Sequence, residues 1–194
     1  GGGPTWEAMN FAAMGQFHQL WDEAHRCGLP IIYNFMNNFY GMGGQTSGET
    51  MGYDVLARFG AGVNAEAMHA ERVDGYNPLA VADAILRKKT IFEAGDGPVL
   101  LDTITYRFSG HSPSDQSSYR ERSEIETWQQ EDPIVHFAKD LVDADVCGQS
   151  DIDAITELGE KLIVKALPKA VDKTISPRPN LMQLNNLLTE TMYS

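Results

Sequence analysis

Short apolar runs alternate with helical segments along the first half of the chain. Residues 31–35 (IIYNF) and 99–106 (VLLDTITY) are rich in β-branched, aromatic and aliphatic side chains and predict buried strands. Residues 67–73 predict a third strand, and the helix after it has Asn77 as its N-cap and Pro78 at its first position. Strands that alternate with helices form parallel sheets with helices on both faces. The sequence therefore predicts an α/β fold.

Further helices are expected before and after this region. Residues 4–26 predict a long helix and residues 53–59 a short one, which a turn at residues 60–64 follows. Residues 107–122 (RFSGHSPSDQSSYRER) form a long polar connection, and loops of this length are commonly functional. Beyond it the pattern is helical: Ser150 is expected to cap a helix at residues 151–167, and residues 181–192 form a last segment. We expect an α/β domain at residues 1–150 and a helical C-terminal extension of the same domain at residues 151–194.

The charge and the two cysteines limit the class of protein. The formal net charge of −12 argues against a nucleic-acid or anionic-membrane surface, and no apolar run is long enough to span a membrane. Cys27 and Cys147 lie far apart and lack a metal-type spacing, which indicates reduced thiols and a cytoplasmic protein, or a mitochondrial matrix protein in a eukaryote. The start at Gly1 without a methionine indicates part of a longer polypeptide.

The first predicted strand leads into Asn37 and Asn38, which a loop rich in glycine follows at Gly41, Gly43 and Gly44. Ligands of open α/β sheets bind at the carboxyl ends of strands, and an asparagine oxygen is a hard neutral ligand that suits Mg²⁺ or Ca²⁺. A plain loop is the more common reading of such a pair when it is taken alone.

Several motifs strengthen the metal-site interpretation because they occur together and in a fixed order. The motifs are EAMNFAA (7–13), LPII with NNFYGMG (29–43), VDGYNP (73–78), GPVLLDTITYR (97–107), GHSPSD (110–115) and SYR (118–120). Together they resemble the α subunits of thiamine-diphosphate-dependent 2-oxo acid dehydrogenases, the pyruvate, branched-chain and acetoin enzymes.

The resemblance implies a thiamine-diphosphate-binding fold and an α component that binds thiamine diphosphate and Mg²⁺. It implies oxidative decarboxylation of a small 2-oxo acid, with acyl transfer to lipoamide. The implied partners are a β subunit or β domain, without which the chain is inactive, and an acyltransferase that bears the lipoyl group. An α₂β₂-like assembly follows from an active site shared between subunits.

The resemblance also implies which residues form the site. It assigns two Mg²⁺ ligands to this chain, the side chain of Asn38 and the main-chain carbonyl of Tyr40. It places cofactor contacts at Gly3, Asn38, Tyr40, Met42 and His111. Oxygen ligands completed by phosphate are what Mg²⁺ prefers, which agrees with this assignment.

His111 is the candidate catalytic residue. Unlike the other four histidines, it lies between Gly110 and Ser112 in the polar loop, just past a predicted strand. The resemblance places it beside the diphosphate and the reaction centre, where an imidazole can donate a hydrogen bond or exchange protons near neutral pH. Ser112 matches a regulatory phosphoserine of the animal enzymes, although a turn serine is the simpler interpretation. Four residues are expected to hold the shape of the loop: Arg107, Asp115, Tyr119 and Arg120.

One family motif is missing from the sequence. The family has Gly-Asp-Gly ahead of the asparagine pair, whereas Gly1, Gly2 and Gly3 contain no carboxylate. The aspartate lies upstream, or glycine replaces it. Two alternatives therefore stay open: another thiamine-diphosphate enzyme, such as an acetoin dehydrogenase or a transketolase-like enzyme, and a cofactor-dead scaffold subunit. A dinucleotide-binding Rossmann domain is disfavoured because the chain lacks G-x-G-x-x-G after its first strand.

Overall fold

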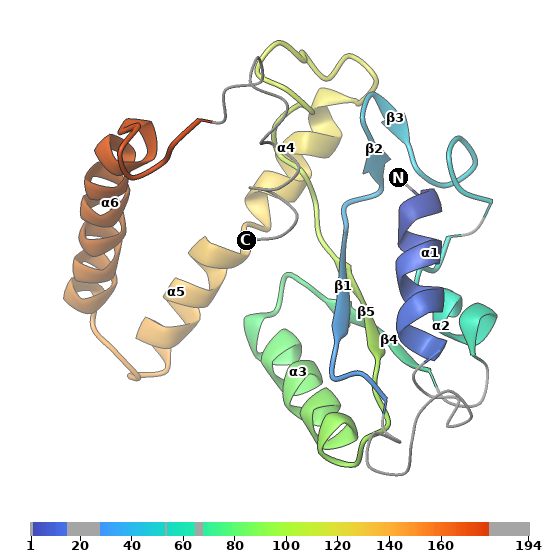
Figure 1. The fold of residues 1–194 in the computed structure, drawn as a ribbon. Coiled ribbons are helices and arrows are strands. Elements are labelled where there is room, and N and C mark those ends of the chain that lie inside the picture. Colours follow the sequence, from blue (N-terminus) through green and yellow to red (C-terminus); the bar gives the residue numbers. More distant parts are fainter. Residues whose placement is uncertain (1, 15–27, 53, 65–67, 179–194) are drawn as a thin grey trace. The chain divides into compact units, whose positions relative to one another are not determined.

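A computed structural model describes residues 2–14, 28–52, 54–64 and 68–178 of the chain (Figure 1). The chain divides into two compact units, Gly1–Phe137 and Ala138–Ser194. The elements are α1 (Gly2–Ala13), β1 (Ile32–Asn37), β2 (Tyr40–Gly41), β3 (Gly44–Gln45), α2 (Arg58–Val63), β4 (His69–Asp74), α3 (Pro78–Glu93), β5 (Val99–Ile104), α4 (Arg122–Gln130), α5 (Pro133–Asp143) and α6 (Gln149–Val171). The domain boundary expected at residue 150 stays a prediction.

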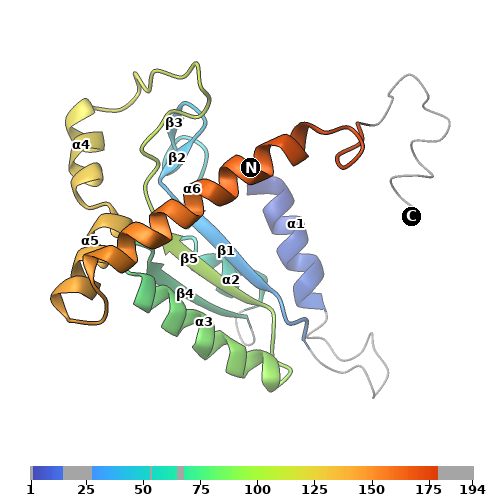
Figure 2. The ribbon, with the colours of Figure 1, turned by 90° about the vertical axis from the view of Figure 1, so that its left-hand side faces the viewer.

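The first unit contains a three-stranded parallel sheet with the order β1-β5-β4 (Figure 2). Strand β5 is central and pairs with both neighbours in the same register, so Ile104 lies beside Asn37 on one side and Asp74 on the other. The carboxyl ends of all three strands therefore meet at one edge of the sheet. The predicted parallel α/β architecture is confirmed.

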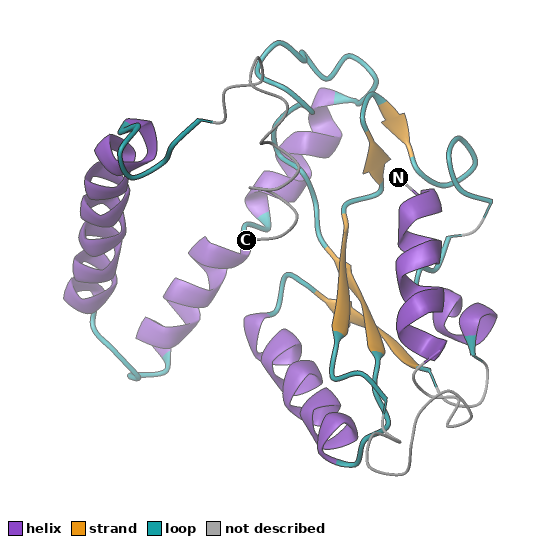
Figure 3. Ribbon diagram, viewed as in Figure 1, coloured by secondary structure: helices purple, strands orange, loops and turns teal. Residues whose placement is uncertain are grey.

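The two faces of β5 pack against different helices. Leu100 and Leu101 are both fully buried, and they point to opposite faces because side chains alternate along a strand. Helices α1 and α2 lie on one side of the sheet and α3 on the other (Figure 1 and Figure 3), which confirms the predicted helices on both faces. One apolar cluster joins Met9, Leu56, Phe59, Met68 and Leu100, and the other joins Val73, Ala84 and Leu101.

Strand β1 is longer than the sequence predicts. It continues to Asn37, which pairs with Ile104 and donates a hydrogen bond from its side chain to buried Asp102. These tertiary contacts outweigh the poor strand propensity of asparagine. The expected glycine-rich loop also contains a small antiparallel hairpin, in which Tyr40 pairs with Gln45.

Two predicted helices are also placed differently. The short helix expected at residues 53–59 is α2, which begins at Arg58 and continues to Val63 through residues that were predicted to form a turn. There Phe59 packs in the core, and its burial outweighs the local glycine signal. The long first helix is observed as α1, and residues 15–27 lie outside the described residues.

Helix α3 begins as the sequence predicts. The side-chain oxygen of Asn77 accepts hydrogen bonds from the amides of Leu79 and Ala80, at 3.1 Å each. Pro78 occupies the first turn, where its missing N–H costs nothing. The helix follows β4 directly and packs on the sheet, so this cap also sets where the chain turns back.

Replacing Asn77 with alanine is expected to lower the free energy of unfolding by about 1 kcal/mol, because two helix N–H groups lose their acceptor. Urea unfolding followed by circular dichroism measures this change. Asn77→Asp keeps an acceptor at the same place and should unfold as the wild type does. Equal destabilisation in both variants would contradict a capping role.

The second unit contains helix α6. The sequence predicts Ser150 as its N-cap, and this is wrong: the helix begins after Gly148, whose amide donates to the Asp151 side chain at 2.8 Å. The helix thus begins two residues earlier than expected, and the Asp151 carboxylate caps its first turn. The segment predicted at residues 181–192 lies outside the described residues. None of the helices in the described ranges has the length and apolarity needed to cross a membrane.

Candidate active site

Two consecutive asparagine turns form at the carboxyl end of β1. The side-chain oxygen of Asn37 accepts a hydrogen bond from the Phe39 amide at 3.3 Å, and that of Asn38 accepts one from the Tyr40 amide at 3.0 Å. Such side-chain contacts with the backbone two residues later are typical of asparagine turns. They fix both side chains at the edge where the three parallel strands end.

The hairpin after Asn38 contains energetically unfavourable backbone conformations. Phe39 and Met42 have φ angles of 64° and 54°, in the left-handed region that side chains other than glycine rarely adopt. Non-glycine residues in such conformations cluster at functional sites, and each costs about 1–3 kcal/mol. The hairpin therefore needs support from the residues around it.

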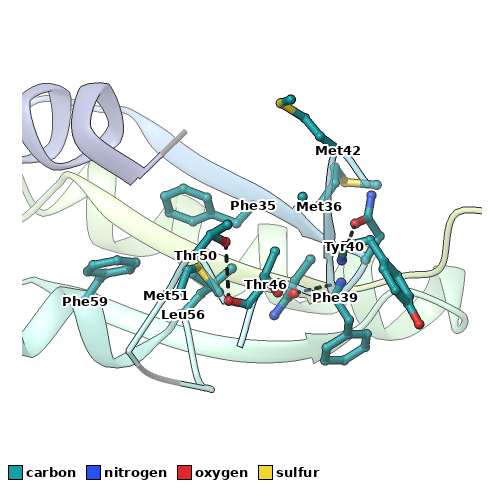
Figure 4. A pocket seen from close by; sticks show the side chains of 13 residues that line it. Phe35, Met36, Phe39, Tyr40, Met42, Thr46, Thr50, Met51, Leu56 and Phe59 are labelled. Atoms are coloured by element: carbon teal, nitrogen blue, oxygen red, sulfur yellow. Dashed lines mark hydrogen bonds between the residues drawn. The ribbon is translucent and has the colours of Figure 1, made fainter. Parts of the chain in front are cut away.

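A cavity of about 330 Å³ opens beside this hairpin (Figure 4). Asn38, Tyr40 and Met42 line it together with apolar side chains. Figure 4 shows Phe35 and Phe59 towards one end of the cavity and Phe39 and Tyr40 towards the other. The full lining is Phe35, Met36, Asn37, Asn38, Phe39, Tyr40, Gly41, Met42, Thr46, Thr50, Met51, Leu56 and Phe59.

The polar loop after β5 is organised around Asp115. Its carboxylate accepts hydrogen bonds from the amides of His111 and Ser117, at 2.6 and 2.8 Å, and from the Tyr119 hydroxyl at 2.8 Å. These hydrogen bonds, the His111 amide first, lower the pKa of Asp115 to about 2. A Cβ on Gly110 would lie 2.3 Å from the Asp115 carbonyl oxygen, so the loop closes only around glycine.

Arg107 ties this loop to the hairpin. Its guanidinium donates to the carbonyl oxygen of Met42 at 2.9 Å and to the Tyr119 hydroxyl at 2.6 Å. The Tyr119 ring also faces Gly43, where a Cβ would make ordinary contact with it. A continuous set of hydrogen bonds thus runs from Met42 through Arg107, Tyr119 and Asp115 to the His111 backbone. The structure brings together the two segments that carry Asn38 and His111.

Arg120 stabilises the polar loop through hydrogen bonds to its backbone and to one of its serines. It is buried, and its guanidinium donates to the carbonyl oxygens of Arg107 and Ser109 and to the Ser117 hydroxyl. The predicted role of the loop's arginines, aspartate and tyrosine in holding its shape is therefore confirmed. The His111 side chain is exposed and has no hydrogen-bond partner among the described residues.

The sequence interpretation missed two carboxylates near the site. Asp102 is fully buried in β5, where it accepts hydrogen bonds from the Asn37 side chain and from Arg72 Nε, both at 2.8 Å. Glu124, on α4, accepts from the hydroxyl of Tyr40 at 2.7 Å. An aspartate within the apolar run VLLDTITY is a signal that could have revealed the first. The second had no sequence signal, because it depends on a contact between distant segments.

The oxygens at the hairpin fit part of a Mg²⁺ site. The Asn38 side-chain oxygen has a second lone pair beyond its bond to the Tyr40 amide, and the Tyr40 carbonyl is another hard neutral donor. Among the residues that the structure describes, no group of three histidine, cysteine or acidic side chains could hold a metal. Two neutral oxygens suit an ion whose remaining ligands are phosphate, water and a carboxylate from elsewhere. Gly3 lies in the first turn of α1, and its cofactor contact stays a prediction.

Comparisons with known proteins show the family of this chain. Residues 8–178 match the dehydrogenase E1 component family. The chain is 32% identical, over 99% of its length, to the mitochondrial pyruvate dehydrogenase E1 component subunit alpha type I of Ascaris suum. It is 29% identical over 88% to the corresponding alpha subunit of Rickettsia bellii, and 32% over 89% to that of Dictyostelium discoideum.

The chain spans about half the length of these relatives: 43% of the Ascaris protein, 50% of the Rickettsia protein and 44% of the Dictyostelium protein. The match nevertheless covers most of this chain and includes β1, the hairpin, the polar loop and α6. The chain belongs to the dehydrogenase E1 component family, among the relatives of its α subunits, and it has the thiamine-diphosphate-binding fold of that family.

Proposed function

We propose that the chain is the part of an E1 α component that binds the diphosphate of thiamine diphosphate through Mg²⁺. The reaction is oxidative decarboxylation of a 2-oxo acid, with transfer of the acyl group to lipoamide. The observation that carries the proposal is the asparagine turn at the end of β1, where Asn38 and Tyr40 present two oxygens beside a cavity. Family membership supports the same cofactors.

In this proposal the side-chain oxygen of Asn38 and the carbonyl of Tyr40 hold Mg²⁺, and the Met42 segment contacts the cofactor. When bound, thiamine diphosphate supplies an electron sink for the decarboxylation. The protein positions that group and excludes water, and the apolar walls of the cavity at Phe35 and Phe59 serve the second task.

His111 is the proposed catalytic residue. Asp115 accepts a hydrogen bond from its backbone amide, which fixes the main chain while the imidazole stays exposed. An imidazole held this way can donate a hydrogen bond to a phosphate oxygen or move a proton near neutral pH. The Asp115 carboxylate, whose pKa lies near 2, stays ionised near neutral pH, so the hydrogen bonds that shape the loop persist there.

The proposed partners are a β subunit or β domain, which completes the active site, and an acyltransferase that bears the lipoyl group. The relatives are named as alpha subunits, which supports a need for a second component. We place the assembly in the cytoplasm, or in the mitochondrial matrix of a eukaryote.

His111→Asn is expected to lower kcat by about 100-fold or more, because general acid–base groups contribute 10²–10⁴-fold to rates. The assay uses the longest native polypeptide that contains this chain, co-expressed with its β partner. It follows acceptor reduction that depends on the 2-oxo acid, with Mg²⁺ and thiamine diphosphate added. His136→Asn is the matched control: the imidazole of this exposed histidine on α5 forms a hydrogen bond with the Gln130 carbonyl, far along the chain from the site, and activity should be unchanged.

Full activity in His111→Asn would remove His111 from the chemistry. Activity with acetoin or with sugar phosphates, and none with 2-oxo acids, would assign a different thiamine-diphosphate reaction to the same site.

A second candidate function is a scaffold subunit that binds no cofactor. It is favoured by one observation, the absence of any carboxylate from the thirteen residues that line the cavity. A folded protein that assembles with its β partner, but binds neither thiamine diphosphate nor Mg²⁺, would support this candidate.

A further inference from the structure

One carboxylate of α4 holds two tyrosines from different parts of the sheet edge. The Oε1 atom of Glu124 accepts a hydrogen bond from the Tyr40 hydroxyl at 2.7 Å and another from the Tyr106 hydroxyl at 2.9 Å. Tyr40 belongs to β2, and Tyr106 follows the end of β5. Glu124 therefore connects the hairpin, the central strand and helix α4 through a single atom.

Aromatic packing encloses this contact. Tyr40 is 8% exposed, and its ring meets that of Tyr106 edge-on with centroids 6.1 Å apart. The Arg120 guanidinium lies 5.2 and 5.3 Å from the centroids of the same two rings. Burial and then the Glu124 carboxylate raise the pKa of Tyr40 well above its usual value, and the same two causes raise that of Tyr106. Both phenols therefore stay protonated and donate to Glu124 at physiological pH.

The hairpin depends on such outside support. Strands β2 and β3 have two residues each, too few to be stable alone, and the left-handed backbone at Phe39 immediately precedes Tyr40. A fixed phenol at one end of Tyr40 restrains its side-chain torsions, and these in turn restrain the main chain that carries its carbonyl oxygen. In metal sites, partners that orient a ligand in this way typically change affinity 10–100-fold when they are removed.

We propose that Glu124 is a positioning residue that aims the main-chain carbonyl of Tyr40 at the metal ion. The inference rests on the proposed function, because it takes the Tyr40 carbonyl as a Mg²⁺ ligand. It adds a residue from α4 that does not touch the metal, the cofactor or the substrate.

The test measures metal affinity directly in the holoenzyme with its β partner. Mn²⁺ replaces Mg²⁺, thiamine diphosphate is saturating, and free Mn²⁺ is quantified by electron paramagnetic resonance. Glu124→Ala should raise the Kd for Mn²⁺ by about 10-fold or more. Glu126→Ala is the matched control, since Glu126 lies on the same helix in an exposed ion pair with Arg122, and its Kd should stay within about twofold of the wild type.

A merely structural role would lower the melting temperature and kcat without changing the need for metal. A positioning role instead raises the Mg²⁺ concentration that gives half-maximal activity, and saturating Mg²⁺ restores most of kcat. Glu124→Gln keeps an oxygen acceptor for both phenols and should restore the wild-type affinity.

If Glu124→Ala does not fold, Tyr40→Phe tests the same positioning role, because it removes the hydroxyl that donates to Glu124 and leaves the main-chain carbonyl in place. It should raise the Kd for Mn²⁺ as Glu124→Ala does, and the double variant should add little, since both changes break one shared contact. Wild-type affinity for Mn²⁺ in Tyr40→Phe, or in folded Glu124→Ala, would contradict the positioning role of Glu124 and would leave the proposed function standing. If the wild-type holoenzyme itself holds no Mn²⁺, the proposed function fails and the inference fails with it.

Discussion

Replacing Asn38 with alanine is expected to abolish Mg²⁺-dependent binding of thiamine diphosphate. The change removes a proposed metal ligand and also the acceptor that orients the Tyr40 amide at 3.0 Å, so both ligand positions are lost or displaced. The expected loss in affinity exceeds the 10–100-fold typical of residues that only support a ligand. Isothermal titration of the cofactor with and without Mg²⁺, in the complex with the β partner, measures it.

Two further variants make this result specific. Asn38→Asp keeps an oxygen at the same position and adds a charge that Mg²⁺ favours, so binding should persist. Asn34→Ala changes an exposed asparagine of the same strand, where it accepts a hydrogen bond from Thr103, and cofactor affinity should not change. Wild-type affinity in Asn38→Ala would show that this side chain is not a ligand.

Asp102→Ala is expected to destabilise the protein by about 1–3 kcal/mol, the usual cost of leaving a buried polar group, here the Asn37 side chain, without its hydrogen-bond partner. Asp102 is fully buried in the central strand, and its carboxylate accepts from the Asn37 side chain and from Arg72 Nε at 2.8 Å, and from the Ala57 amide at 3.2 Å. The variant leaves these three donors without their acceptor. Urea unfolding measures the change in the free energy of unfolding.

Asp83→Ala is the matched control for Asp102. Asp83 pairs with Arg87 on the exposed face of α3, where such ion pairs contribute about 0–1 kcal/mol. Similar unfolding curves for the two variants would contradict a structural role for the buried carboxylate. We also expect Asp102→Ala to weaken cofactor binding, because Asn37 holds the start of the turn that presents Asn38.

Local signals explain which parts of the fold could be predicted. The apolar residues of β5 are buried on both faces, so the run from Val99 predicted a buried strand directly. The cap at Asn77 needs only the next three residues, and the sequence located it to the residue. Each of these features depends on neighbours in the chain.

The remaining features depend on contacts between distant segments. Glu124 and Tyr40 form a hydrogen bond although they lie 84 positions apart in the sequence, and Asp102 and Asn37 do so at 65 positions apart. The local sequence around each residue does not indicate its partner. The β2–β3 hairpin likewise forms where the pattern indicates only a loop, because Phe39 and Met42 adopt left-handed conformations that are not expected of their side chains. For the site, Asn38, Tyr40, Met42 and His111 were named from family resemblance, and their chemical roles stay predictions.

We propose that Asn38 and Tyr40 ligate the cofactor's metal ion, and anomalous scattering tests this most directly. The crystals contain the complex with the β partner, grown with thiamine diphosphate and with Mn²⁺ in place of Mg²⁺. We expect one strong peak about 2.1 Å from both the Asn38 side-chain oxygen and the Tyr40 carbonyl oxygen. A peak held by other residues, or bound cofactor with no peak at this hairpin, would contradict it.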